Sequence, residues 1–498
     1  MRGSGVLAHI TSLPSPYGIG DIGYPSYWFC DLLHSMKQTY WQILPINPVE
    51  KFYEFSPYSS YSAFAGNILL ISPELLFEWG LIPKEELEPC VSFSKEKTDY
   101  ENSFVYKRRL LEISFENFLK NKGKREFEEF CEREKFWLED YSNFVVLKRI
   151  FRNKEWNKWS QELIEREESA LEEFRRKNKL EIEKIKFFQF VFFTQWELLR
   201  NYCKSKGVKI IGDIPIYVNF DSVEAWVNRD IFKLRGNIEP EFVSGVPPDN
   251  FSPYGQLWGH PVYDWENLLK RDFDWWILRL CHSSRLFDII RIDHFRGFES
   301  YWEVPFGEKT AEKGKWVKAP GEIFLKKVFE KIPQISLIAE DLGGYTDEVQ
   351  RLLRIFNIPG TRVLQFGFTD GGSDNPYLPH NFDRNCVVYT GTHDNNTAKG
   401  WFEKELDGKG RKKLMDYIGK EITLENVNWE LIRLAMQSVA EIAIIPLQDI
   451  LGLSEEGRMN KPATTYGNWR WRFEKDQVKE EFKIKFSDLT EIYGRGRK

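Results

Sequence analysis

Eight short apolar runs recur along this chain of 498 residues, most of them rich in Val and Ile and each ending near a polar residue. Near-continuous apolar runs of this kind are typical of parallel strands that are buried on both faces. Helical patterns lie between the later runs, for example at Glu322–Ile332 and Thr346–Phe356, and this alternation predicts βαβ units. The runs are Val6–Leu13, Trp41–Ile46, Lys209–Val218, Phe287–His294, Ser336–Leu342, Arg362–Phe366, Cys386–Asp394 and Ile442–Asp449.

The number of runs favours an α/β fold with a closed (β/α)8 TIM barrel, although a doubly wound open sheet fits the same pattern. The spacing is uneven, because residues 47–208 separate the second run from the third. We therefore expect a single barrel over residues 1–498, with a mostly helical insertion subdomain at residues 51–200 after the second strand. A loop insertion is expected at residues 220–270 after the third strand, and no C-terminal β-sandwich is expected.

Two segments inside these insertions are unusual. Gln161–Lys186 is dense in Glu, Lys and Arg at helical spacing and contains no Gly or Pro, which predicts a solvated helical insertion more than a partner-binding helix. Ser244–Tyr263 contains four Pro and three Gly among aromatic residues. Long irregular loops are usually functional or disordered, and the aromatic residues argue against disorder.

Composition excludes several classes of protein. Lys and Arg total 70 against 75 Asp and Glu, and this near-balance argues against a nucleic-acid binder. A hydrophobic fraction of 42% excludes a mainly disordered chain. The six Cys form no CxxC pair, so we expect six buried thiols in a reducing cytoplasm, with a monomer as the default state. The start of the chain lacks a signal-peptide core, and the densest apolar stretch, Phe187–Phe193, is too short to cross a membrane.

Common cofactor motifs are absent or out of context. Residues 18–23 read GIGDIG and match GxGxxG, but Pro14 and Pro16 separate them from the preceding strand, and Asp21 would repel a pyrophosphate. A glycine-bent loop over the barrel mouth is the better interpretation. The seven His form no HxH or HExxH pattern. We therefore expect neither a metal site nor a cofactor.

Three of the predicted strands end in an acid: Asp293 follows IIRI, Glu340 follows SLIA and Asp394 follows VVYTGTH. Because the C-terminal ends of barrel strands meet at one mouth, where the active sites of such barrels lie, we expect these carboxylates to come together. For any single acid, capping a helix or pairing with an arginine is the more common role. Three acids on neighbouring strands, with Arg291 and His393 adjacent, favour a catalytic site.

The local sequence predicts opposite environments for two of these acids. Arg291 and Asp293 are two residues apart on a strand, so they point to the same side, and the arginine should lower the pKa of Asp293 and keep it ionised. Glu340 follows apolar residues, where desolvation should raise its pKa, as a general acid requires. An ionised nucleophile beside a protonated acid is typical of glycosidic bond chemistry.

Aromatic residues make up 16% of the chain. Most are expected in the core, but Tyr58, Tyr254, Trp258 and Tyr263 lie in loops beside Gly and Pro. Sugar rings present apolar C–H faces that pack on Tyr and Trp. These loop aromatics therefore suggest a carbohydrate track.

Eight segments, taken together and in order, are specific. They are LPSPYGIGDIG (Leu13–Gly23), SPYSSYSAFAGN (Ser56–Asn67), GDIPIYV (Gly212–Val218), PPDNFSPYGQLWGHPVYDW (Pro247–Trp265), RIDHFRGF (Arg291–Phe298), AEDLG (Ala339–Gly343), GTHDNNT (Gly391–Thr397) and PATTYGNWRWR (Pro462–Arg472). With them, nearly the whole chain resembles the 4-α-glucanotransferases of the amylomaltase type, glycoside hydrolase family 77 in the α-amylase clan. α-Amylases carry an Asn-His pair after the third strand, where this chain has GDIPIYVNF, and the difference favours the glucanotransferase branch.

The resemblance implies a role for each residue of the site. Asp293 would be the nucleophile, Glu340 the general acid/base, and Asp394 with His393 would hold sugar hydroxyls and stabilise the transition state. Arg291 would orient Asp293, and Asp213 would support the same subsite. The residues implied to line the groove for neighbouring glucose units are Ser56, Tyr58, Gln256, Trp258, Asp370 and Asn468. The 220–270 insertion would arch over that groove.

The implied reaction transfers a segment of an α-1,4-glucan such as maltodextrin to the 4-hydroxyl of an acceptor glucan or glucose. It would use a retaining double displacement through a covalent glucosyl–Asp293 ester, which requires the two carboxyls to lie about 5–5.5 Å apart. Two alternatives stay open. A hydrolase of the same clan would release only shorter products, and a non-catalytic glucan-binding protein would have no use for the three acids.

Overall fold

A computed structural model describes residues 2–89, 91–120, 124–236, 238–248, 252–343, 346–369 and 371–497. Its centre is a closed barrel whose strands follow the order β1-β14-β13-β12-β11-β8-β3-β2, each parallel to its neighbours. Closure confirms the predicted (β/α)8 barrel and excludes the open sheet. The barrel strands are β1 (Gly3–Leu7), β2 (Tyr40–Gln42), β3 (Lys209–Ile214), β8 (Ile289–Ile292), β11 (Leu337–Ala339), β12 (Gly360–Val363), β13 (Cys386–Tyr389) and β14 (Ile442–Pro446).

Every barrel strand overlaps one of the eight predicted runs, and β13 and β14 are buried along their whole length. All eight runs were predicted to extend past the C-terminal end of their strand, and two of them show the reason. In the first, the strand β1 ends at Leu7, and Ile10–Ser12 forms a 3₁₀ turn, η1. In the sixth, β12 ends at Val363 and the helix α14 begins at once. In both places the chain turns at the barrel mouth, although its residues stay apolar.

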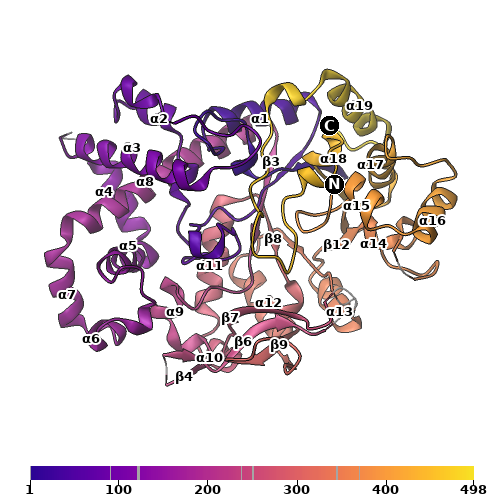
Figure 1. Ribbon diagram of the computed structural model, residues 1–498. Helices are drawn as coiled ribbons and strands as arrows, with labels where there is room; N and C mark the ends of the chain where they lie inside the picture. Colours follow the sequence, from indigo (N-terminus) through magenta and orange to yellow (C-terminus); the bar gives the residue numbers. More distant parts are fainter. Residues whose placement is uncertain are drawn as a thin grey trace.

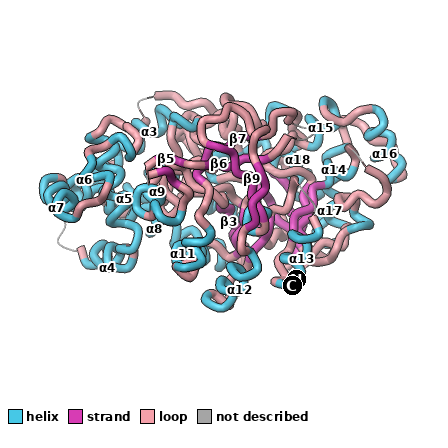
Figure 2. Tube along the Cα trace, turned by 90° about the horizontal axis from the view of Figure 1, so that it is seen from below, coloured by secondary structure: helices cyan, strands magenta, loops and turns pink. Residues whose placement is uncertain are grey.

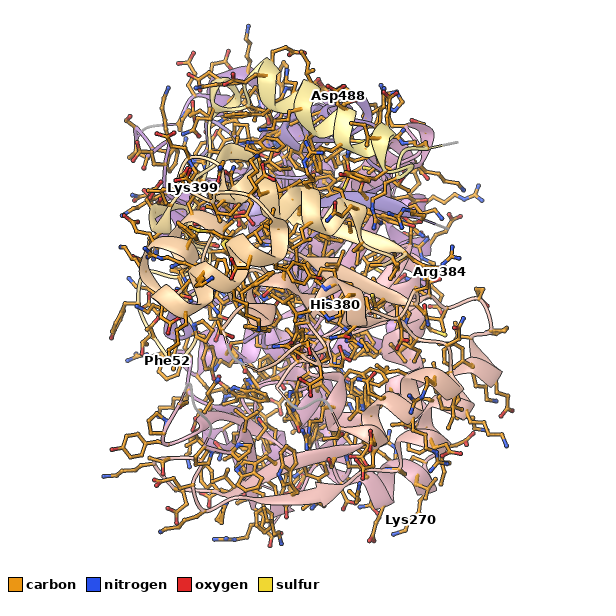
Figure 3. The ribbon with its side chains drawn as sticks, turned by 90° about the vertical axis from the view of Figure 1, so that its right-hand side faces the viewer. Phe52, Lys270, His380, Arg384, Lys399 and Asp488 are labelled. Carbon is orange, nitrogen blue, oxygen red and sulfur yellow. The ribbon has the colours of Figure 1, made fainter. Side chains whose placement is uncertain are left out.

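Helices lie around the barrel (Figures 1 and 2). Lys399 of α15 and Asp488 of α19 lie toward one end of the face in Figure 3, and Lys270 of α10 lies at the other. The surrounding helices are α1 (Tyr24–Ser35), α10 (Trp265–Lys270), α11 (Asp274–Leu286), α12 (Gly321–Lys331), α13 (Asp347–Ile355), α14 (Leu364–Gly367), α15 (Ala398–Lys404), α16 (Gly408–Ile418), α17 (Val427–Gln437), α18 (Leu447–Leu451) and α19 (Glu480–Ile492). Between-strand helices α12 and α13 match the two predicted helical segments to within a residue at each end.

Residues between β2 and β3 form a helical layer on one side of the barrel, drawn in purple at the left of Figure 1. Its helices are α2 (Pro73–Glu78), α3 (Tyr100–Lys120), α4 (Arg125–Arg133), α5 (Lys135–Ile150), α6 (Gln161–Ile164), α7 (Glu168–Lys177) and α8 (Lys179–Ser205). The long helix α8 packs on α3, α4 and α5 and also on α1 and β3 of the barrel. The ring of Phe187 in α8 stacks on Phe118 of α3 at 4.6 Å.

The charged stretch Gln161–Lys186 is helical, as predicted, but it is neither continuous nor fully solvated. It breaks at Arg166, whose φ is 58°, and again at Asn178, which has non-helical angles. Leu171 and Phe174 of α7 are buried. One face of the stretch therefore packs against the other insertion helices, because apolar residues recur at helical spacing among the charges.

The segment Ser244–Tyr263 is more regular than predicted. Strands β6 (Phe242–Val246) and β7 (Gln256–Pro261) join β9 (Ser300–Pro305) and β10 (Lys315–Lys318) in an antiparallel sheet of order β10-β9-β6-β7. A Cβ atom on Gly245 would lie 2.5 Å from the carbonyl oxygen of Gln256, so glycine permits this close pairing. The short strands β4 (Leu234–Arg235) and β5 (Glu239–Pro240) and the helix α9 (Val223–Val227) complete the region.

The remaining predictions about thiols and turns have mixed outcomes. Cys30, Cys203 and Cys386 are buried, but Cys131 is partly exposed and Cys281 is exposed, so the prediction of buried thiols is wrong for these two. Cys90 lies outside the described residues. The GIGDIG segment is a buried turn that leads into α1, with Gly23 at the helix N-cap. None of the described helices is long and apolar enough to span a lipid bilayer.

Candidate active site

A buried Arg291 that contacts two carboxylates forms the centre of the site. Strands β3 and β8 pair so that Asp213 lies opposite Arg291. Nη1 of Arg291 donates to Oδ2 of Asp213 at 2.5 Å and to Oδ1 of Asp293 at 3.0 Å. Asp213 is completely buried, whereas 28% of the Asp293 side chain is exposed. Of the two carboxylates, Asp293 is therefore the one that a substrate can reach.

Glu340 directly follows β11, the strand next to β8 in the barrel. Its Oε2 accepts a hydrogen bond from the backbone N–H of His294 at 2.7 Å, and its Oε1 accepts one from the N–H of Leu342 at 2.8 Å. His294 is the residue after Asp293. Backbone groups from two strand ends thus fix the Glu340 carboxyl beside Asp293.

The electrostatics of these two acids differ in part from the sequence expectation. Burial, together with the negative charge of Asp293, raises the pKa of Glu340 to about 8, which confirms the predicted direction. Desolvation also raises the pKa of Asp293, although the charge of Arg291 opposes this. The predicted net lowering of the Asp293 pKa is therefore wrong, because enclosure in the barrel mouth outweighs the arginine.

His393 and Asp394 lie in the loop after β13, and His393 is connected through Tyr58 to the buried Asp213. Nε2 of His393 is 3.4 Å from Oδ2 of Asp394, whose side chain is 43% exposed. The His393 ring stacks on Tyr58 with 5.2 Å between ring centroids, and the Tyr58 hydroxyl donates to Oδ2 of Asp213 at 2.7 Å. Contacts between side chains thus connect His393 to the Asp213–Arg291 pair.

Four of the predicted groove residues lie around this centre: Ser56, Tyr58, Gln256 and Trp258. Trp258 on β7 meets the His294 ring edge-on, with centroids 4.7 Å apart. Its Nε1 donates to Oε1 of Gln256 at 3.3 Å. Ser56 accepts a hydrogen bond at Oγ from the backbone N–H of Tyr58 at 3.3 Å, which fixes the turn that carries the tyrosine. The turn at Ser56 and the strand β7, which was predicted to be a loop at Trp258, therefore bring aromatic side chains to the strand-end acids.

Other predicted groove residues have different surroundings. Oδ1 of Asn468 accepts from the N–H of Lys461 at 2.9 Å and its Nδ2 donates to the carbonyl of Thr464 at 3.0 Å, so the side chain holds its own loop. Asp370 lies outside the described residues. Tyr263, which was predicted as part of the carbohydrate track, is buried and donates to the Ile216 carbonyl, so that prediction is wrong.

Two residues join the site that the sequence did not single out. Nδ2 of Asn460 donates to Oδ1 of Asp394 at 2.6 Å. The Trp469 ring lies 5.6 Å from Tyr58 and 6.0 Å from His393. Trp469 belongs to the PATTYGNWRWR segment, which was the available signal, whereas Asn460 precedes that segment and has no motif of its own.

The arrangement offers an accessible carboxylate beside a protonated carboxylic acid, with a histidine and aromatic rings around them. Within the ranges that the structure describes, no three His, Cys, Asp or Glu side chains gather so as to hold a metal ion. The groups that do gather are suited to proton transfer and to nucleophilic attack at carbon.

Comparison with known proteins decides the family. The sequence model of the 4-alpha-glucanotransferase family, glycoside hydrolase family 77, matches residues 8–477. The chain belongs to the 4-alpha-glucanotransferase family. The resemblance seen in the sequence segments and the expectation of an enzyme of this family are thereby confirmed.

Two bacterial relatives in this 4-alpha-glucanotransferase family match along nearly their whole length. The chain is 48% identical over 498 residues to the 4-alpha-glucanotransferase of Aquifex aeolicus, covering 99% of this chain and 100% of that one. It is 45% identical to that of Clostridium butyricum, covering 98% and 99%. Among solved structures, the amylomaltase of Streptococcus agalactiae in complex with acarbose shares 39% identity at a TM-score of 0.96, with both chains covered completely.

Proposed function

We propose that this protein transfers segments of α-1,4-glucan to the 4-hydroxyl of an acceptor glucan or glucose, through a covalent glucosyl ester on Asp293. The single observation that carries the proposal is the placement of Asp293, held by Arg291, next to a Glu340 with a raised pKa. Family membership supports the choice of an α-glucan as donor and acceptor.

In the first step, the Asp293 carboxylate attacks the anomeric carbon of the donor while Glu340 gives its proton to the departing 4-oxygen. The bond between C1 and the glycosidic oxygen breaks, and the bond between C1 and Oδ of Asp293 forms. Arg291 and the buried Asp213 orient the attacking carboxylate. His393 and Asp394 hold hydroxyls of the sugar as its ring distorts.

In the second step, the 4-hydroxyl of an acceptor attacks C1, Glu340 takes up its proton, and Asp293 leaves as a carboxylate. Esterified Asp293 carries no charge, so one of the causes that raise the pKa of Glu340 is removed. In the ester intermediate the pKa of Glu340 therefore falls, which keeps Glu340 ionised and able to accept the proton of the acceptor hydroxyl as a general base. Two inversions give net retention at C1.

Transfer in place of hydrolysis requires an acceptor sugar to occupy the groove and displace water. Trp258 on β7 and the aromatic pair Tyr58 and Trp469 offer apolar faces on two sides of the acids. We propose that the described parts of residues 220–270 and the 461–468 loop form the walls of this groove, within one catalytic barrel.

Incubation with maltotriose, followed by separation of the products by length, tests the proposed function. Transfer gives glucose together with a ladder of maltodextrins longer than the substrate. Products that are all shorter than maltotriose would identify a hydrolase instead, and binding of maltotriose without turnover would identify a non-catalytic glucan binder.

Asp293→Asn tests the assignment of the nucleophile. We expect a loss of transfer of about 10³-fold or more with unchanged folding, because the ester cannot form. Asp288→Asn is the matched control, since Asp288 precedes the same strand at the opposite end of the barrel and accepts from the Ile210 N–H at 2.8 Å. Near-full activity of Asp293→Asn would refute the assignment.

A further inference from the structure

A small pocket adjoins His393 and is lined by residues of the loops that follow β1, β13 and β14. Its lining includes His9, His393, Thr397, Gln448, Arg458 and Met459. The free space is about 20 Å³. One water molecule needs roughly 10–15 Å³ measured in the same way, so the pocket has room for a single water and for little else.

Two buried ring nitrogens are left unpaired in the residues that line this pocket. His9 and His393 are each 5% exposed. Nδ1 of His9 and Nδ1 of His393 have no hydrogen-bond partner among the described residues. Leaving such a group unpaired costs about 1–3 kcal/mol, and two such nitrogens in the lining of one pocket point to a shared polar partner.

The two nitrogens of His393 face different surroundings. Burial lowers the pKa of His393, so the ring is neutral and carries one proton. Nε2 lies 3.4 Å from Oδ2 of Asp394, and a carboxylate oxygen can only accept a hydrogen bond. The proton therefore belongs on Nε2, and Nδ1 presents a lone pair that requires a donor.

His9 does not donate to Nδ1 of His393 itself, but it can bind a water molecule that does. Burial lowers the pKa of His9 to about 3, so this ring is neutral as well. No hydrogen bond joins the two rings directly within the described residues. A water molecule has two donors and two acceptors, so it can bond to Nδ1 of His9 in either tautomer and still donate to Nδ1 of His393.

We propose that His9 is a positioning residue, which holds one water molecule in this pocket so that the water donates to Nδ1 of His393 and keeps the His393 proton on Nε2. The N–H at Nε2 then faces the sugar and Asp394. The partner of one imidazole nitrogen decides which tautomer the ring adopts. The kinetic part of this inference rests on the proposed function, whereas the tautomer does not.

The test compares His9→Phe, which keeps a ring of similar size without polar atoms, with His9→Gln, which keeps a side chain able to hold water. Met459→Leu is the control, because it changes an apolar residue of the same pocket lining. Nitrogen-15 NMR of protein labelled at histidine reports the tautomer of His393, whose signal is assigned by its loss in His393→Asn. The transfer kinetics are measured with maltotriose.

In the wild-type protein we expect His393 to be protonated at Nε2 and unprotonated at a hydrogen-bonded Nδ1. His9→Phe should move the Nδ1 signal toward that of an unbonded nitrogen and lower kcat/KM about tenfold, mainly through kcat. His9→Gln should recover most of both effects, and Met459→Leu should change neither.

Two results would overturn the proposal. One is a His393 that carries its proton on Nδ1 in the wild-type protein. The other is a His9→Phe variant that keeps both the wild-type His393 signal and the wild-type kcat/KM. If His9→Phe does not fold, the proposal is tested by the tautomer of His393 in the wild-type protein and by His9→Gln, which should keep the wild-type His393 signal and most of kcat/KM. A wild-type protein without transfer activity would refute the proposed function, while the NMR result would still test the pocket.

Discussion

Arg291 serves two carboxylates through a single nitrogen, Nη1. Asp213 is completely buried and cannot reach a substrate, so its charge fixes the guanidinium in place. The arginine in turn favours the ionised form of Asp293, the acid that remains accessible. Asp213 thus limits the rotation of the Arg291 side chain, and Arg291 in turn limits the rotation of the Asp293 carboxylate.

The pH dependence of transfer follows from the two acids. The active form needs a proton on Glu340 and none on Asp293. Because the pKa of Glu340 is raised to about 8, kcat/KM should fall as the pH rises through that value. A profile with maltotriose from about pH 5 to pH 10 measures this limb. In Glu340→Gln the alkaline limb should vanish from the residual activity, and a limb that persisted there would assign it to another group.

Tyr58→Phe isolates one hydrogen bond of the site. The change removes the donor to Oδ2 of Asp213 but keeps the ring that stacks on His393. We expect kcat/KM to fall about tenfold and the free energy of unfolding to fall by about 1.5 kcal/mol, the usual worth of a hydrogen bond to a charged group. Tyr202→Phe is the matched control, because its hydroxyl donates to Asp31 at the surface.

Contacts within the site could be predicted from the sequence only where the two residues lie close together along the chain. Arg291 and Asp293 are two residues apart on one strand, so their shared side was predictable. The pairing of Arg291 with Asp213 depends on the register of β3 against β8, which no local pattern contains. The contact of Asn460 with Asp394 joins two loops and was equally invisible.

Among the elements, α3 fastens the helical insertion to the barrel through a buried lysine. Nζ of Lys107 donates to the carbonyls of Leu69 and Ile71 at 2.8 and 2.9 Å and lies 3.6 Å from Oδ2 of Asp21. Asp21 sits in the glycine-rich turn after η1, so the acid that seemed wrong for a nucleotide loop has a structural partner. Burial raises the pKa of Asp21 to about 6 despite the lysine.

Lys107→Met should lower the free energy of unfolding by about 3 kcal/mol, since it leaves two buried carbonyls without their donor and the buried Asp21 without its positive partner. Urea denaturation followed by circular dichroism measures the change. Lys120→Met on the same helix is the control, because Nζ of Lys120 donates to Asn117 in an exposed position. Equal stability of the two variants would contradict the role of Lys107.

The elements themselves were predictable where a repeating period fixed them. The fully buried runs of β13 and β14 read as strands, and α12 has apolar residues at helical spacing. The prediction of elements failed where the conformation of a single residue determined whether a helix broke or a strand formed. The helical stretch around Arg166 breaks because that residue adopts a positive φ, and β6 forms a strand because Gly245 admits a close neighbour. Tertiary contacts select such conformations, so they cannot be predicted from the composition of the segment alone.

Across the whole molecule, the two ends of the chain lie side by side (Figure 1). Arg495 is completely buried there and donates to the carbonyls of Gly3, Met436 and Ala440 at 3.0, 2.7 and 3.0 Å. Gly3 begins β1, and Ala440 lies just before β14. One side chain near the C-terminus thus bridges the two strands that close the barrel.

Arg495→Met should therefore lower the free energy of unfolding by at least about 3 kcal/mol, because several buried carbonyls lose their donor at once. Thermal unfolding measured by circular dichroism checks this. Arg433→Met is the control, since Arg433 contacts Tyr493 in an exposed position. A melting temperature of Arg495→Met within a degree of the control would show that the carbonyls find other partners.

The pairing of β1 with β14 also has a consequence during synthesis. Residues 3–7 leave the ribosome long before their partner strand, residues 442–446, is translated. Until then, β1 exposes one hydrogen-bonding edge, and nascent strand edges of this kind promote aggregation. We expect ribosome-bound chains that end before β14 to be bound by chaperones and cut readily by proteases, and chains a few dozen residues longer to become resistant in a single step.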